Sequence, residues 1–152
     1  MSKQQYLAFE AGGRRFCAPL LQIREVKKIG AITAIPQSVP DMLGVINLRG
    51  EIVPVIDLQA RIARNSARAA TDRMICIFVQ NEQRLSAVWV DQVLDVIEFS
   101  TDQILPIPPS MFEISQNAFA GIVADDADFA IVVSLWTLTE QDNAFTRQLV
   151  PC

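Results

Sequence analysis

The amino-acid sequence predicts a mainly β fold built from two small barrels of about five strands each, packed against one another. The 152-residue chain is 51% hydrophobic and 20% charged, which is typical of a folded globular protein. Short apolar runs alternate with turn residues along most of the chain. The order hairpin, strand, proline-bearing connector and hairpin occurs twice, and closing each set into a barrel would remove exposed sheet edges.

The first half contains two expected hairpins on either side of a single strand. Gly12-Gly13 and Arg49-Gly50 supply the turns of the two hairpins. The second hairpin is apolar on nearly every residue, which predicts that both of its arms have two buried faces. Pro54 cannot donate a ladder hydrogen bond, so we expect it at an edge or a bulge. The expected strands are residues 6–10, 14–18, 23–29, 43–48 and 52–58.

Residues 59–72 differ in character from the segments around them. Alanines alternate there with Arg61, Arg64 and Arg68, and the arginines fall at helical spacing. We expect a short helical connector or a mobile loop between the two halves. A basic binding face is the alternative to a solvated connector.

The second half repeats the pattern of the first. Asn81-Glu82 and the acidic segment 125–128 supply the turns of its two hairpins, and a short C-terminal helix is expected over residues 137–143. The expected strands are residues 74–79, 85–90, 93–99, 118–124 and 129–133.

An internal repeat relates the two halves. Residues 22–26 resemble residues 92–96 at an offset of 70, and Gly44 and Gly121 each open an apolar arm at an offset of 77. We therefore expect one domain over residues 1–152 with two barrel units, 5–66 and 72–142, between which strands could be exchanged. A groove between two such barrels would be a natural docking place for a partner.

The composition excludes several classes of function. The chain has no histidine, so the usual general base, the usual transition-metal ligand and the common nucleophile pairs are missing. No phosphate-binding glycine motif occurs. The formal net charge of −4 argues against a nucleic-acid binder. We expect a protein that is not an enzyme, although catalysis by a carboxylate of raised pKa in a closed pocket is an alternative.

The sequence also predicts no metal, no cofactor and a cytoplasmic location. Cys17 and Cys76 lie in apolar segments, Cys152 is the last residue, and no CxxC pair occurs. The acidic segment 125–128 offers too few oxygen ligands for a calcium loop. No apolar run is long enough for a membrane helix, and the first residues lack the apolar core of a signal peptide.

Residues 44–58, GVINLRGEIVPVIDL, resemble the CheW family of bacterial chemotaxis coupling proteins. The similarity extends over roughly residues 5–141. It implies two SH3-like five-stranded barrels with a hydrophobic interface. It also implies an adaptor that joins chemoreceptor signalling tips to the regulatory domain of the histidine kinase CheA, recruited to membrane-associated arrays. The alternatives are a scaffold of an auxiliary array controlling pili, surface sensing or second-messenger output and, more distantly, a nucleic-acid-binding small barrel. Residues 133–138 and the alanine-arginine segment depart from the family pattern.

The same resemblance implies roles for individual residues. The implied receptor contacts are Ile23, Glu25, Val26, Arg49, Val93 and Val96. Strand alternation predicts Ile23 and Glu25 on one face and Val26 on the other. For Arg49, the alternative is an internal salt bridge with Glu25 or Asp57. The residues expected to act structurally at turns are Gly44, Asn47, Gly50, Asp57 and Gly121. Trp136 could anchor a partner or pack on a barrel end.

Overall fold

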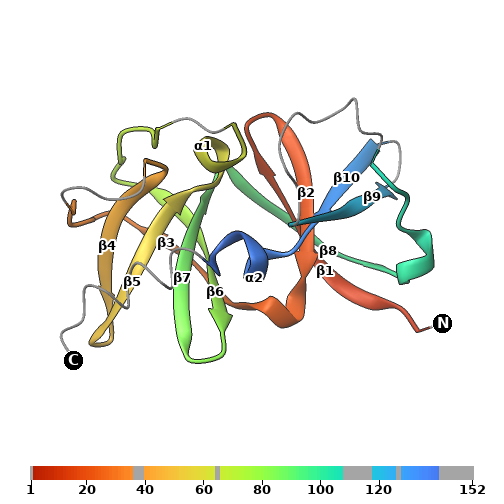
Figure 1. The fold of residues 1–152 in the computed structure, drawn as a ribbon, viewed down its shortest axis with the longest axis horizontal. Helices are drawn as coiled ribbons and strands as arrows, with labels where there is room; N and C mark the ends of the chain where they lie inside the picture. Colours follow the sequence, from red (N-terminus) through yellow and green to blue (C-terminus); the bar gives the residue numbers. More distant parts are fainter. Residues whose placement is uncertain (1, 36–39, 64–65, 108–117, 126–127, 141–152) are drawn as a thin grey trace.

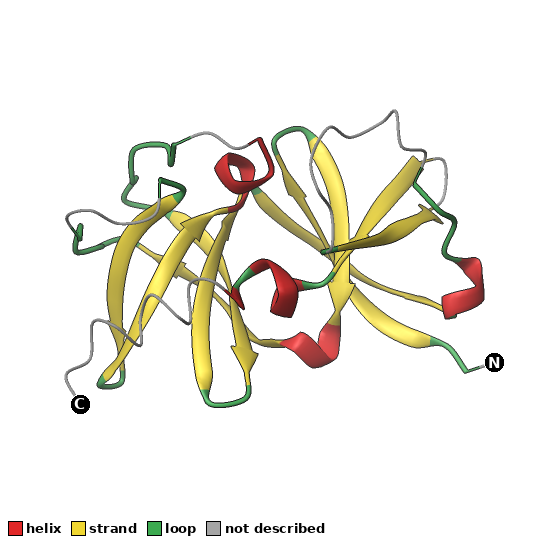
Figure 2. Cartoon of the chain, in the orientation of Figure 1, coloured by secondary structure: helices red, strands yellow, loops and turns green. Residues whose placement is uncertain are grey.

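The computed structural model describes residues 2–35, 40–63, 66–107, 118–125 and 128–140, and the described chain is mainly β (Figure 1 and Figure 2). Two five-stranded barrels lie side by side, which confirms the expected fold class. The strands are β1 (Gln4–Ala11), β2 (Arg14–Pro19), β3 (Ile23–Ile29), β4 (Met42–Leu48), β5 (Glu51–Asp57), β6 (Met74–Asn81), β7 (Arg84–Val90), β8 (Gln92–Phe99), β9 (Phe119–Asp125) and β10 (Asp128–Val133). The short helices are η1 (Leu20–Gln22), α1 (Leu58–Ala63), η2 (Thr101–Gln103) and α2 (Leu135–Leu138).

The two sheets do not follow the two halves of the sequence. One sheet has the strand order β3-β6-β7-β5-β4 and uses only residues 23–90; we call it the central barrel. The other has the order β8-β1-β2-β10-β9 and is built from the segments on either side; we call it the terminal barrel. Each half, 5–66 and 72–142, therefore contributes strands to both barrels, because β3 pairs with β6 and β8 pairs with β1.

The strand pairings reproduce the internal repeat. Each barrel contains one parallel pair, β5 with β7 in the central barrel and β2 with β10 in the terminal barrel, and its other pairs are antiparallel. Each of the strands β1 to β5 therefore has a counterpart five strands later in the chain, which occupies the equivalent position in the other barrel. The two barrels have the same topology, with the roles of the two halves interchanged.

A short backbone bridge closes each barrel. Thr33 and Val45 exchange two N–H···O bonds of 2.9 Å, and Leu105 and Ile122 exchange two of 2.7 and 2.8 Å. Glycine is required beside each bridge, because a Cβ on Gly44 would lie 2.2 Å from the Thr33 carbonyl oxygen. A Cβ on Gly121 would lie 2.3 Å from the carbonyl oxygen of Leu105. Both glycines have a φ near +150° (+152° and +154°). Gly44 and Gly121 are therefore strand residues at a close approach and not turn residues, which corrects the prediction.

The core has three layers. Phe78 and Cys76 belong to the cluster inside the central barrel, and Tyr6 stacks on Phe99 inside the terminal barrel. The third cluster lies between the barrels and takes side chains from both sheets, among them Phe9, Phe16, Ile77 and Val88. Because one apolar layer is shared, the barrels pack as a single unit.

The β4–β5 hairpin differs from its prediction in two respects. Strand β5 is buried from Val53 onward, but most of β4 is only half-buried because it lies at the end of the sheet order. Pro54 is in an interior strand and not at an edge or a bulge. It is tolerated there because its partner Val45 directs its backbone bonds to Thr33, and the parallel ladder with β7 starts only at Val55.

The helical segments also differ from their expected bounds. In the predicted connector, α1 ends at Ala63 and residues 66–73 are not helical. The C-terminal helix α2 begins two residues earlier than predicted, and residues 141–143 of that prediction lie outside the described chain. The two proline-bearing connectors of the predicted repeat correspond to residues 35–40 and 105–109. Parts of both, and of the predicted turn 125–128, also lie outside the described chain. No helix in the described ranges is both long enough and apolar enough to cross a membrane.

Candidate partner-binding surface

Strands β3 and β8 occupy equivalent positions at one end of each sheet order, and they carry most of the residues that the resemblance assigns to receptor contact. Ile23 and Val93 are half-buried and pack against the cluster between the barrels. Val26 and Val96 are 41% and 48% exposed. Each strand thus presents one valine to solvent and one apolar side chain to the seam between the barrels.

A β-bulge in each strand determines which side chains share a face. In β3, Ile23 pairs with Val79 and Glu25 pairs with Phe78, so Arg24 is an extra residue. Ile23 and Val26 therefore share the face that continues the inter-barrel cluster. The predicted alternation, with Ile23 and Glu25 together, was wrong because it assumed a regular strand.

The same irregularity occurs in β8. Val93 pairs with Phe9 and Val96 pairs with Leu7, so the register shifts between these two pairs. Val93 and Val96 consequently share the face of Phe9 and Leu7, two members of the inter-barrel cluster. We call the faces that carry Ile23, Val26, Val93 and Val96 the seam face.

Arg49 projects from the tip of the β4–β5 hairpin. It adopts a positive φ of 51°, followed by Gly50 at 86°, and the Asn47 side-chain oxygen accepts a 2.7 Å hydrogen bond from the Gly50 N–H. The side chain is 60% exposed, and its Nη2 donates to Glu25 Oε1 at 3.5 Å. Of the two internal partners considered for Arg49, the structure shows Glu25 and not Asp57.

Glu25 lies within ion-pair distance of two further cations. Arg24 Nε is 3.9 Å and Lys27 Nζ 3.7 Å from its carboxylate oxygens. One half-buried carboxylate thus sits among three basic side chains, which gives the rim of the central barrel beside β3 a basic character.

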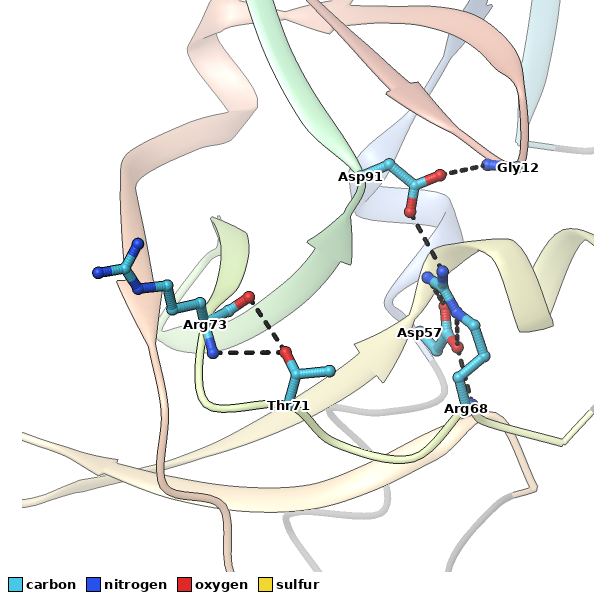
Figure 3. Close-up of polar contacts among 6 residues, drawn as sticks. All are labelled: Gly12, Asp57, Arg68, Thr71, Arg73 and Asp91. Carbon is cyan, nitrogen blue, oxygen red and sulfur yellow. Dashed lines mark hydrogen bonds and ion pairs between the residues drawn. The ribbon is translucent and has the colours of Figure 1, made fainter.

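Asp57 is fully buried at the end of β5 and accepts hydrogen bonds from the alanine-arginine segment (Figure 3). Arg68 donates from Nε at 2.9 Å, from Nη2 at 2.8 Å and from its backbone N–H at 2.9 Å. The guanidinium also lies 4.2 Å from the centre of the Trp89 ring. Asp57 was expected to cap a turn; instead it anchors the segment that follows Arg64 and Asn65 in the chain.

The same arginine links the two barrels. Arg68 Nη1 donates to Asp91 Oδ1 at 3.2 Å, and Asp91 Oδ2 accepts from the Gly12 N–H at 2.9 Å in the β1–β2 turn (Figure 3). Burial alone raises the pKa of Asp57, but the hydrogen bonds and charge of Arg68 outweigh it, so the pKa lies below its ordinary value. That direction is the opposite of the raised pKa that a carboxylate enzyme would need.

Arg61, like Arg68, forms hydrogen bonds that join separate segments of the chain, and we call these two arrangements the arginine clamps. Its Nε and Nη2 donate to the two oxygens of Asp41 at 2.7 and 2.6 Å, and its Nη1 donates to the Leu138 carbonyl at 2.7 Å. It therefore ties α1 to the residue before β4 and to the end of α2. Arg61 and Arg68 thus stabilise the fold by internal hydrogen bonds, so neither the predicted basic binding face nor the predicted solvated connector describes their role. Arg64 lies outside the described residues.

The end of the described chain packs across the seam through α2. Trp136 is 39% exposed, and its Nε1 donates to the Gln80 carbonyl at 2.7 Å. The buried Gln22 accepts from the Leu135 N–H at 2.7 Å and donates to Ser134 Oγ at 3.3 Å. Trp136 is thereby fixed against the central barrel while part of its ring stays accessible.

Two further sequence expectations concern reactive and metal-binding groups. Burial raises the pKa of the Cys76 thiol to about 12, so this thiol remains protonated at neutral pH. The described residues, which do not include 126 and 127 of the acidic turn, contain no group of three or more side chains placed to hold a metal ion.

Comparison with known proteins gives consistent matches. Residues 5–143 match the family model described as the CheW-like domain. The chain is 33% identical to the probable chemotaxis protein CheW of Rhizobium etli, covering 93% of this chain and 90% of that protein. It is 27% identical to protein FrzA of Myxococcus xanthus, covering 80% of this chain and 74% of that protein.

A solved structure shares the fold. The scaffolding protein TtCheW from Thermoanaerobacter tengcongensis superposes with a TM-score of 0.77 at 29% identity, covering 91% of this chain and 88% of that one. Since the family model spans most of the chain and both barrels have a structural counterpart, this protein belongs to the CheW-like family of coupling and scaffold proteins.

Proposed function

We propose that this protein is a non-catalytic adaptor that couples chemoreceptor signalling tips to the regulatory domain of a CheA-type histidine kinase. It would act in the cytoplasm, recruited to a membrane-associated receptor array. The observation that carries the proposal is the seam face, where Val26 and Val96 are exposed at equivalent positions of a CheW-like fold that matches over residues 5–143. Exposed apolar side chains next to a rigid core suit the docking of an amphipathic helix.

Arg49 adds a polar contact to this surface in the proposal. The strained hairpin tip holds the residue outward, and its planar guanidinium can bind a carboxylate or carbonyl groups of a partner. The hydrogen bond to Glu25 orients the side chain without burying it. Glu25 would thus act as a positioning residue for Arg49.

The second candidate is a scaffold of an auxiliary array that controls pili, surface sensing or second-messenger output. The match to FrzA favours it, because a protein that is not named a chemotaxis protein is 27% identical to this chain over 80% of its length. The two candidates use the same surface and differ in the receptor and kinase that are bound.

Calorimetric titration tests the proposal. Purified protein is titrated with the signalling-tip fragment of a receptor, and separately with the regulatory domain of a CheA-type kinase, both from the same genome. We expect both partners to bind the wild type. Failure to bind any receptor tip or kinase domain of that genome would refute the adaptor function, and binding to one array's components alone would identify the array.

Matched variants locate the contact. Val96→Arg should weaken binding of the receptor tip at least about tenfold, because a charge replaces an exposed apolar contact. Phe129→Arg is the control, since Phe129 is 56% exposed on β10 and lies outside the seam face. Equal effects of the two substitutions would show that the seam face is not the receptor site.

A further inference from the structure

The seam face consists of two equivalent half-faces that end in opposite charges. After the bulge in β3, Val26 pairs with Ile77 and Lys28 pairs with Ile75, so both share the face of Ile23. In β8, Val96 pairs with Leu7 and Glu98 pairs with Gln5, on the face of Val93. The sequence offset of 70 relates Ile23 to Val93, Val26 to Val96 and Lys28 to Glu98.

The charge difference extends along both strands. Strand β3 carries Arg24, Lys27 and Lys28 against Glu25, whereas β8 carries Asp95 and Glu98 and no basic residue. Arg24 and Lys27 lie within 4 Å of Glu25, at 3.9 and 3.7 Å. Within the described part of the chain, neither Lys28 nor Glu98 has an ion-pair partner, and both are exposed.

Equivalent apolar contacts alone would accept an elongated partner in either direction. Since the two barrels share one topology, reversing the partner would exchange the contacts to Val26 and Val96 with little change in buried apolar area. The charges of Lys28 and Glu98 make the two directions unequal for a partner with one acidic and one basic end. In the reversed direction, like charges of the partner and this protein lie together at both ends.

We propose that the seam face reads the direction of a helical partner, with the partner's acidic end against Lys28 and its basic end against Glu98. This inference rests on the proposed adaptor function, because it names the charge pattern of the segment that docks. Lys28 and Glu98 are then specificity-determining residues that set orientation, while the valines provide contact in either direction.

A designed peptide tests the direction of docking. It is an amphipathic helix with one apolar face, an acidic N-terminal third, a basic C-terminal third and a nitroxide spin label at its N-terminus. Broadening of backbone amide resonances then reports which strand the labelled end approaches. For the wild type we expect broadening along β3. For the double variant Lys28→Glu/Glu98→Lys we expect it along β8.

Single substitutions measure the size of the effect. Lys28→Glu should weaken binding of the peptide by about two- to fivefold, the range of a single exposed ion pair. Lys27→Glu and Glu82→Lys are the controls, because they make the same charge changes at exposed positions. Lys27 pairs with Cys76 on the opposite face of β3, and Glu82 lies between β6 and β7. Equal losses in the controls would show that net charge alone matters.

The remaining outcomes also decide the inference. Broadening of both strands in the wild type, no transfer to β8 in the double variant, or no peptide binding would each overturn it. Concentration-dependent self-association that Lys28→Glu abolishes and the double variant restores would overturn it in favour of a second copy on this face. Titration of the wild type with the receptor tip and the kinase domain, run in parallel, separates these results from a failure of the adaptor function.

Discussion

The backbone of Thr33 lies against Gly44 where the central barrel closes, so the identity of residue 44 is set by space as well as by its φ of +152°. We expect Gly44→Ala to lower the free energy of unfolding by about 3 kcal/mol, because its Cβ would overlap the Thr33 carbonyl oxygen and the backbone must shift. Urea denaturation measures the change.

Gly13→Ala is the matched control. Gly13 has a φ of +76°, but nothing lies within 4 Å of a Cβ added there. Its cost should be about 1 kcal/mol, from the left-handed conformation alone. A loss at Gly44 no larger than that at Gly13 would contradict the steric explanation.

Arg68 and Asp57 provide a second prediction for single residues. Arg68→Ala should lower the free energy of unfolding at pH 7 by about 2 kcal/mol. This is less than the roughly 3–5 kcal/mol of fully buried pairs, because the Arg68 side chain is 38% exposed. Arg68→Lys should retain part of the stability, since it keeps the charge but loses the paired donors.

The same ion pair predicts a pH dependence. The pKa of Asp57 is lower in the folded protein than in the unfolded chain, so its stabilisation is present above the unfolded value of about 3.9. It is lost as the pH falls through the folded pKa. The difference in free energy of unfolding between wild type and Arg68→Ala should therefore shrink below about pH 4 in acid denaturation experiments. A constant difference would indicate that Arg68 stabilises by packing alone.

At the scale of the element, the bulges in β3 and β8 determine what each side chain contributes. Val93→Arg should lower the free energy of unfolding by about 2–4 kcal/mol, because Val93 packs against the inter-barrel cluster. Val96→Arg should change it by less than about 0.5 kcal/mol, because Val96 is 48% exposed. Thermal and urea unfolding of the two variants test this contrast. Similar losses in both would place Val96 in the core.

The sequence predicts strands well and registers poorly. The hairpins around Gly12-Gly13 and Arg49-Gly50 were found from local turn residues, and their observed bounds differ from the predicted ones by a residue or two. The bulge at Arg24 was missed, because it is defined only by the register with β6, a strand about fifty residues away in the chain. No local signal marked it, since β3 reads as an ordinary β-branched run.

The arginine clamps were missed for a related reason. Helical spacing drew attention to Arg61 and Arg68, but their carboxylate partners lie 20 and 11 residues away in the sequence. Pairing at such distances depends on how β4 and β5 meet the connector. The isolated aspartates Asp41 and Asp57 beside apolar strands were the available signal, since a buried carboxylate requires a cation or several donors.

At the scale of the whole molecule, the shared core predicts cooperative unfolding. Strands from each half complete both barrels, and the inter-barrel cluster takes side chains from both sheets. We expect a single urea transition, with coincident curves from tryptophan fluorescence and from far-ultraviolet circular dichroism. Separate transitions for the two probes would show that the barrels unfold independently.

The nesting of the central barrel inside the chain also orders its folding during synthesis. Every strand of that barrel has left the ribosome once residue 90 and a tunnel's length of chain beyond it are made. The β1–β2 hairpin precedes this barrel in the chain, yet its two edges are covered only when β8 and β10 have been made. This hairpin therefore stays exposed to chaperones and to neighbouring nascent chains after the central barrel is complete.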